Sequence, residues 1–332
     1  MRTYWKQYGF GAAPGRLGDK HEVMNFQYKI PRIHPNLIDF NLDSLPVDKL
    51  IMASQPKSND GKPKTNTQSP AYRPKGSTTP GALTYALLRL LDLPLQYKLL
   101  TTWGPSLIST LHGVPLSSSP SVLSPIAPNT IPGLSPYYTL IFGLATASAL
   151  KHTWWSFSIL NYVFRLPLVT GIAGYNTGLN IVNGLLSLWA VSSNSPFRNA
   201  LTTGSWIELF DVKNSTVPIG VALFAVGMGI EIAAEVQRKA FKAKPENKDR
   251  PFAGGLFGVV RNVNYSGYLL WRVGYAICCA GLPWAAVILV QQGSDFAFRA
   301  VPEMDSYCEQ RYGEQWEEVR KKVPYRLIPY IY

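Results

Sequence analysis

Basic, amide and phenolic side chains are spaced along the last third of this 332-residue sequence in a way that suits phosphate binding. Arg238 and Lys242 are four residues apart, so in a helix they share one face. Arg261 would add a third cation near that face, and guanidinium forks match phosphate oxygens. Asn264 can pair with a carboxamide. These four residues are therefore candidates for binding a phosphorylated ligand.

Phenols and carboxylates in the same stretch could move protons. Tyr265 and Tyr312 carry hydroxyl groups that can donate a proton to a reacting group. Glu231 and Glu235 end an apolar segment, where an acid either has a function or neutralises neighbouring cations, and both readings stay open. The histidines and cysteines show no metal-ligand spacing, so no metal site is expected.

The elements that must position these residues are apolar and long. Charged residues make up 16% of the chain, compared with about 25% in soluble domains. Charge is wholly absent from residues 99–150, 166–197, 214–230 and 273–294. This argues against a soluble enzyme, and a hydrophobic share of 46% argues against a disordered chain. We predict an all-α, polytopic membrane protein with about five to seven transmembrane helices.

Five apolar stretches approach the length of about 20 residues that crosses a bilayer core. They are Tyr137–Leu150, Trp154–Thr170, Ile172–Val191, Val217–Ile232 and Leu269–Val290. The last contains Pro283, which predicts either a bent helix or two shorter helices.

The chain divides into three predicted regions. Residues 1–80 are a polar arm, and the segment 54–80 is so rich in Pro, Lys, Asn, Ser and Gly that we predict flexibility. Residues 81–216 are predicted to be membrane helices. The first of these carries Arg89, Asp92 and Lys98, which predicts an interfacial or short membrane element. Residues 217–332 hold the candidate site and a C-terminal tail.

The formal net charge of +12 follows the predicted topology. Basic residues concentrate in the arm, at 238–250 and in the tail from Arg299, so the positive-inside rule places all three in the cytosol. They would attract anionic lipids or ligand phosphates. They flank membrane segments and match no DNA- or RNA-reading motif, so nucleic-acid binding is not expected.

Gly227 and Gly229 in the apolar stretch before 238–250 could suggest a dinucleotide-binding turn. No third glycine follows at the required place and no strand precedes them. We interpret them instead as small residues that let two membrane helices approach closely.

Four sequence blocks carry a family resemblance. They are Gly-Leu-Phe-Gly from Gly255, Arg-Asn-Val-Asn-Tyr-Ser-Gly from Arg261, Tyr-Gly-Glu-Gln-Trp from Tyr312 and Val-Pro-Tyr-Arg-Leu-Ile-Pro from Val323. With them, residues 217–332 resemble the C-terminal half of the steroid 5α-reductase/sterol reductase superfamily, of the DUF1295 type. The Arg-x-x-Asn-Tyr-x-Gly core is similar, in looser form, to that of isoprenylcysteine carboxyl methyltransferases.

The resemblance implies a helical membrane enzyme that holds NADPH in a site open to the cytosol and reduces a carbon–carbon double bond of a hydrophobic lipid, such as a steroid, sterol or terpenoid. Matched by position, the expected cofactor contacts are Arg238, Lys242, Arg261, Asn264, Tyr265 and Tyr312. Arg299 and Asp305 lie one position away from a basic and an acidic contact of sterol reductases, which adds them to the candidates.

Two positions depart from the sterol reductase pattern. Asn262 stands where these reductases usually have His, and Tyr268 stands where they have an acidic residue. Tyr268 could donate a proton in place of that acid, so the candidate catalytic residues are Tyr265, Tyr268 and Tyr312.

Our interpretation is an NADPH-dependent reductase in the endoplasmic reticulum membrane, with arm and tail in the cytosol. Its expected partners are a hydrophobic lipid substrate and membrane lipids. One alternative is a membrane S-adenosylmethionine-dependent methyltransferase of the isoprenylcysteine carboxyl methyltransferase type. Another is a non-catalytic lipid-binding relative.

Overall fold

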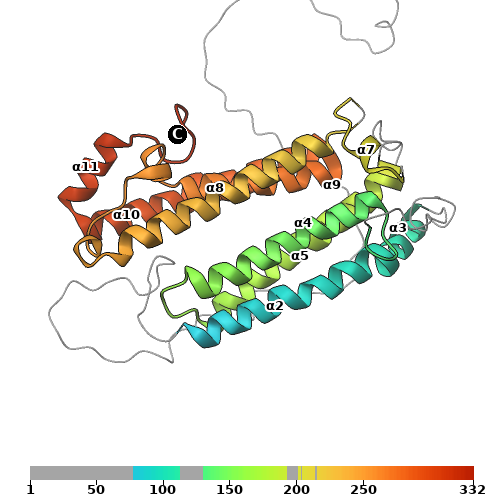
Figure 1. Ribbon diagram of the computed structural model, residues 1–332, viewed down its shortest axis with the longest axis horizontal. Helices are drawn as coiled ribbons and strands as arrows, with labels where there is room; N and C mark the ends of the chain where they lie inside the picture. The colour runs from blue at the N-terminus through green and yellow to red at the C-terminus, as the bar shows by residue number, and fades with distance from the viewer. Residues whose placement is uncertain (1–77, 113–129, 193–200, 203, 214) are drawn as a thin grey trace, which may run out of the picture. The chain divides into compact units, whose positions relative to one another are not determined.

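The computed structural model describes residues 78–112, 130–192, 201–202, 204–213 and 215–332. The secondary structure of these residues is entirely helical, which confirms the all-α prediction for this part of the chain (Figure 1). The predicted arm falls almost wholly outside the described residues. The α-helices are α2 (Thr79–Lys98), α3 (Gly104–His112), α4 (Pro136–Ser158), α5 (Leu166–Ser192), α7 (Trp206–Leu209), α8 (Val217–Ala243), α9 (Val263–Asp295), α10 (Val301–Tyr312) and α11 (Glu314–Lys322).

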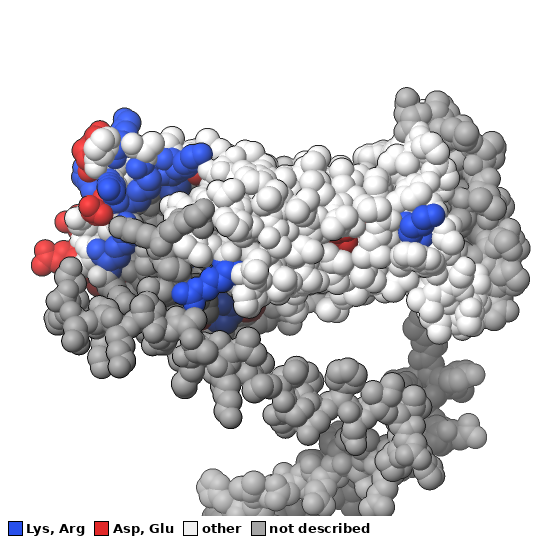
Figure 2. All heavy atoms as spheres, turned by 90° about the horizontal axis from the view of Figure 1, so that it is seen from below, with Lys and Arg blue, Asp and Glu red and all other residues white. Residues whose placement is uncertain are grey.

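Two helices in the described ranges are long and apolar enough to cross a membrane. One is α8, and the other is the helical stretch Val263–Tyr312, in which a π-helical turn at Phe296–Ala300 joins α9 to α10. Figure 2 shows charged side chains gathered mainly at one end of the visible face, followed by a broad stretch with almost none. The number of membrane spans, set above at five to seven, stays a prediction.

One expected span is wrong. The stretch Trp154–Thr170 is not one helix, because α4 ends at Ser158 and α5 begins at Leu166. Pro167 lies in the first turn of α5, where a missing backbone N–H costs nothing. The turn between the helices contains Asn161 and Arg165, which interrupt the apolar stretch.

Helices α8 and α9 pack backbone against backbone at four glycines. A Cβ added to Gly227 would lie 2.4 Å from the backbone nitrogen of Trp271, and one added to Gly274 would lie 2.4 Å from that of Phe224. Gly267 and Gly220 make the reciprocal contacts. Helix approach through small residues is thus confirmed for Gly227, whereas a Cβ on Gly229 would meet nothing within 4 Å.

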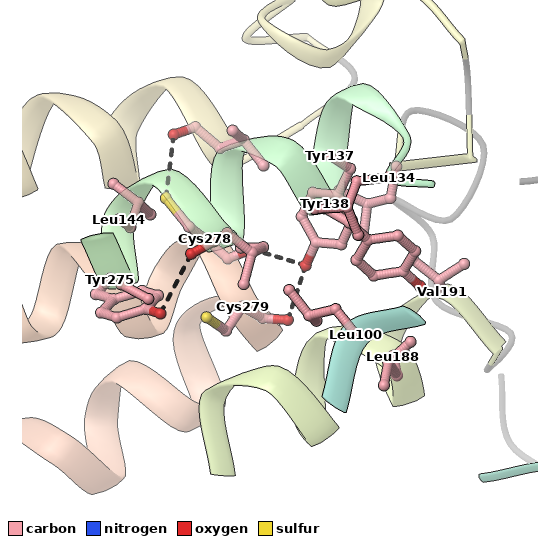
Figure 3. Close-up of a cluster of buried hydrophobic side chains, with 14 of the residues drawn as sticks. Leu100, Leu134, Tyr137, Tyr138, Leu144, Leu188, Val191, Tyr275, Cys278 and Cys279 are labelled. Carbon is pink, nitrogen blue, oxygen red and sulfur yellow. Dashed lines mark hydrogen bonds between the residues drawn. The ribbon is translucent and has the colours of Figure 1, made fainter. Parts of the chain in front are cut away.

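Helix α9 bends before Pro283. Ala280 and Gly281 leave helical geometry, with φ of 72° at Gly281, a value that glycine adopts without strain. Pro283 has no N–H to donate to the carbonyl of Cys279. The hydroxyl of Tyr137 on α4 donates instead to the carbonyls of Cys278 (2.9 Å) and Cys279 (3.1 Å), as Figure 3 shows. The predicted interruption near Pro283 is therefore confirmed, and it takes the form of two helical segments that meet at a kink.

The C-terminal segment returns to the start of α9. The backbone N–H groups of Arg261 and Asn262 donate to the carbonyls of Tyr325 (3.0 Å) and Arg326 (2.9 Å). This return holds the Arg-Asn-Val-Asn-Tyr block and the Val-Pro-Tyr-Arg block, distant in sequence, against each other.

Candidate functional site

Most of the candidate cofactor residues meet where α8 ends, α9 begins and α10 passes. We call this group the outer cluster. Its members are Glu235, Arg238, Lys242, Arg261, Asn264, Asp305 and Tyr312.

Glu235 is the centre of the first half of the outer cluster. Its buried carboxylate accepts a hydrogen bond from the Asn264 amide (3.0 Å) and forms an ion pair with Arg238. Arg238 is three residues further along α8 and 41% exposed, so it lies between the buried acid and solvent. Glu235 thus neutralises a cation, as one of the two sequence interpretations expected.

Arg261 is the centre of the second half. Its guanidinium donates to the carbonyls of Val323 (2.8 Å) and Pro324 (3.0 Å) and reaches Asp305 on α10 (3.4 Å). Arg326 approaches the same carboxylate at 3.6 Å. A hydrogen bond with Tyr332 and the charge of Asp305 raise the pKa of Arg326 above its usual value.

Lys242 joins α8 to the end of α10. Its ammonium donates to the hydroxyl of Tyr312 (3.2 Å) and lies 4.9 Å from the centre of that ring. It also donates to the backbone carbonyls of Asn247, Lys248 and Arg250. Each cation expected to bind phosphate is therefore already engaged by a carboxylate or by oxygens of the chain.

In the described part of this region, both hydrogen-bond donors and hydrogen-bond acceptors lack partners. Among the buried atoms of the described residues that lack a hydrogen-bond partner are Oδ1 of Asp305, Nε of Arg261 and Nε1 of Trp316. Buried polar atoms are normally paired, so such atoms mark a place where water or ligand completes the bonding. A ligand here would need an acidic group for the guanidinium and a donor group for the carboxylate.

Three other candidates lie elsewhere. Tyr265 stacks on Phe296, with ring centres 4.9 Å apart. Tyr268 accepts a hydrogen bond from Arg272 (3.0 Å). Arg299 is 52% exposed and pairs with Asp295 and Glu303, which are one turn away on either side. Of the three candidate tyrosines, Tyr312 contacts a cation of the outer cluster, whereas Tyr265 packs on Phe296 and Tyr268 contacts Arg272.

A second polar group, which sequence reasoning missed, is buried deeper between the helices. We call it the inner cluster. It consists of Arg89 and Asp92 on α2, Lys151 and His152 on α4, Asn176 and Asn180 on α5, Glu231 on α8, and Tyr268 and Arg272 on α9.

Asp92 holds the α2 and α5 side of the inner cluster together. Its carboxylate accepts from Arg89 (3.0 Å), Asn180 (2.7 Å) and Gln96 (2.8 Å). Arg89 and Asp92 are fully buried, so these two charges of α2 point into the bundle, whereas Lys98 at the end of the helix is exposed. The i, i+3 spacing of these charges and the three-to-four-residue spacing of Asn176, Asn180 and Asn183 were the available signals.

Glu231 holds the α4, α8 and α9 side together. Its carboxylate pairs with Lys151 and accepts from the indole of Trp271 (2.7 Å). Arg272 lies 4.2 Å from the centre of the Trp271 ring and donates to Asn176 on α5. The two sides are thus joined through α5.

Comparison with known proteins gives two kinds of match. Residues 175–293 match the family model of a "Protein of unknown function (DUF1295)". A probable O-methyltransferase, ustE, of Ustilaginoidea virens is 30% identical over 264 residues, which cover 79% of this chain and 87% of that protein.

Sterol reductases match over shorter stretches. A Delta(14)-sterol reductase of Mus musculus is 26% identical over 33% of this chain and 29% of its own length. A 7-dehydrocholesterol reductase of Danio rerio is 30% identical over 26% of this chain and 18% of its own length. The resemblance to sterol reductases is confirmed as a distant homology. The chain carries a DUF1295 domain and belongs to the same family as the probable O-methyltransferase ustE.

Proposed function

We propose that this chain is a membrane-embedded O-methyltransferase that uses S-adenosylmethionine and acts on an apolar acceptor. The observation that carries the proposal is the match to a probable O-methyltransferase across 87% of that protein. That alignment is longer than the C-terminal third of the chain, so it also includes the helices that form the inner cluster.

The bonding of the outer cluster supports the same choice. NADPH would bring several phosphate charges, but Arg238 and Arg261 are each paired with a buried acid. The unpartnered atoms instead include one carboxylate oxygen and one guanidinium N–H, on Asp305 and Arg261. An amino-acid group, with its ammonium and its carboxylate, suits this pair of atoms.

The residues have distinct roles in this proposal. Asp305 would accept from the ammonium, and Arg261, anchored on the C-terminal carbonyls, would donate to the carboxylate. Lys242 and Tyr312 would close the aqueous side. The cofactor supplies an electrophilic methyl group, and the protein supplies its orientation and the exclusion of water.

An NADPH-dependent reductase of a lipid double bond is the second candidate. The homology to sterol reductases in the C-terminal part supports it. In either case we propose that the chain acts from the endoplasmic reticulum membrane, that the outer cluster faces the cytosol and that the acceptor comes from the lipid phase.

Equilibrium binding to the full chain in detergent tests the choice. We expect saturable binding of S-adenosylmethionine, weakened about tenfold or more in Asp305→Asn, because a charge-assisted hydrogen bond is lost. Asp249→Asn is the matched control, since its side chain is 89% exposed. Saturable binding of NADPH without binding of S-adenosylmethionine would favour the reductase.

A further inference from the structure

The inner cluster is one negative charge short. Among its described side chains, three are cationic, Arg89, Lys151 and Arg272, and two are anionic, Asp92 and Glu231. Asp92 is bound to Arg89, and Glu231 is bound to Lys151. Arg272 is only 3% exposed and contacts neutral groups: the Asn176 amide, the Tyr268 hydroxyl and the ring of Trp271. A buried, uncompensated cation in an apolar bundle is costly, so an anion there would be strongly favoured.

One edge of the Arg89 guanidinium group, which we call the open edge, has no hydrogen-bond partner in the inner cluster. Its Nη1 donates to Asp92 and reaches Thr177 (3.4 Å), but its Nε and Nη2 have no partner among the described residues. These two N–H groups point in parallel from one edge of the guanidinium, which is the edge that binds a carboxylate through two hydrogen bonds. The side chain is completely buried, so the structure leaves no solvent to satisfy them.

Two further atoms of the inner cluster lack partners in the described part of the chain. They are Nδ1 of His152 and Oδ1 of Asn180. The Asn180 amide donates to the same oxygen of Asp92 that binds Nη1 of Arg89, so the two side chains are neighbours. The ring of His152 is packed between Tyr85 and Trp271, with ring centres 6.0 and 6.1 Å away. The open edge is therefore surrounded mainly by aromatic and apolar groups, with a few polar atoms among them.

We infer that the inner cluster is a binding site for the carboxylate of an apolar, singly charged ligand, held by the Nε and Nη2 groups of Arg89. One negative charge balances the cluster, and a carboxylate satisfies both open N–H groups. The apolar remainder lies among the helices, where His152, Tyr85 and Trp271 provide aromatic surface. A phosphate monoester would bring two charges and exceed the deficit.

The proposed carboxylate site does not depend on the nature of the cofactor. Glu231 and Glu235 are one turn apart on α8, so about 6 Å of helix rise separates a residue of the inner cluster from one of the outer cluster. The two clusters are therefore neighbours along α8.

Binding of cis-parinaric acid, a fluorescent polyene fatty acid, tests the inference in the full chain reconstituted in nanodiscs. Its methyl ester is the matched probe, because it has the same apolar chain and no charge. We expect the acid to bind about tenfold or more tightly than the ester, the ratio for two charge-assisted hydrogen bonds. Equal affinities for acid and ester in the unaltered protein would overturn the inference.

Two variants locate the effect. Arg89→Lys keeps a cation beside Asp92 but removes the two parallel N–H groups. The double variant Arg89→Met with Asp92→Asn removes both charges of the buried ion pair. We expect the acid preference to fall to about threefold or less in both. Arg320→Met, which removes an arginine of α11, is the control and should keep the full preference. An unchanged preference in Arg89→Lys overturns the site, even if the double variant does not fold.

Discussion

Gly227 on α8 lies so close to Trp271 on α9 that no side chain fits between them. An added Cβ would be 2.4 Å from the Trp271 nitrogen and 2.7 Å from the carbonyl oxygen of Gly267, and both neighbours are backbone atoms that cannot rotate away. The same helix offers Gly229, where an added Cβ meets no atom within 4 Å.

Gly227→Leu should therefore destabilise the protein by about 3 kcal/mol or more, because α8 and α9 must separate to admit the side chain. Gly229→Leu should change stability by less than about 0.5 kcal/mol. Thermal unfolding in detergent, followed by circular dichroism, measures both. Similar losses in the two variants would show that the helices do not meet at Gly227.

Tyr137 and Tyr138 provide a second matched pair. Both are fully buried, but the Tyr137 hydroxyl donates to the carbonyls of Cys278 and Cys279, whereas the Tyr138 hydroxyl has no hydrogen-bond partner within the described ranges. Tyr137→Phe should cost about 1–3 kcal/mol of unfolding free energy, since two carbonyls lose their donor. Tyr138→Phe should be neutral or stabilising, and the same unfolding measurement decides it. A larger loss for Tyr138→Phe than for Tyr137→Phe would contradict the assigned bonding.

The buried pair between Lys151 and Glu231 should show strong coupling. Lys151→Met leaves the Glu231 carboxylate with only the Trp271 indole as a partner, which should cost about 3–5 kcal/mol. Adding Glu231→Gln should recover most of that loss, because no unpaired charge remains. A double-mutant cycle from unfolding in detergent measures the coupling. If the two effects simply add, the pair does not form.

The tyrosines distinguish the two proposed chemistries. A reductase that takes its proton from Tyr265, Tyr268 or Tyr312 should lose about 10²–10⁴-fold in rate when that residue becomes Phe. In the proposed methyltransferase the Tyr312 hydroxyl only accepts from Lys242, so Tyr312→Phe should lower the rate by less than about tenfold. Single-turnover methyl transfer with labelled S-adenosylmethionine gives the rate. A hundredfold loss of rate in Tyr312→Phe would indicate instead that Tyr312 donates a proton.

Sequence reasoning succeeded where a local rule decides the structure. The charge-free runs predicted helices, Pro283 predicted the bend in α9, and Gly227 predicted close helix packing. The Arg261 block was expected to lie near Arg238 and Tyr312. In the structure Arg238 is joined to this block through Glu235 and Asn264, Arg261 contacts Asp305 on α10, and Tyr312 contacts Lys242 on α8.

The rest depended on tertiary contacts that no local rule specifies. The turn between α4 and α5 was read as part of a span because its residues other than Asn161 and Arg165 are hydrophobic. Arg89 and Asp92 looked like interfacial charges because their partners Thr177 and Asn180 are 88 residues away in the sequence. Glu235 is three residues from Arg238 on α8, so the sequence already offered it as a partner, whereas Asp305 could be recognised as the partner of Arg261 only once α9 and α10 were placed.

The glycine contacts between α8 and α9 also limit which parts of the helix bundle can move to accommodate a bound ligand. These two helices touch through main-chain atoms at two levels, Gly220 with Gly274 and Gly227 with Gly267, so sliding or spreading them would break several close contacts at once. The two helices therefore form a rigid pair, and Glu231, Glu235 and Arg272 lie on this pair. Room for molecules of different width must then come from α2, α4 and α5, the helices that contribute Arg89, Lys151 and Asn176. Sequence changes that alter acceptor preference should therefore concentrate on those three helices.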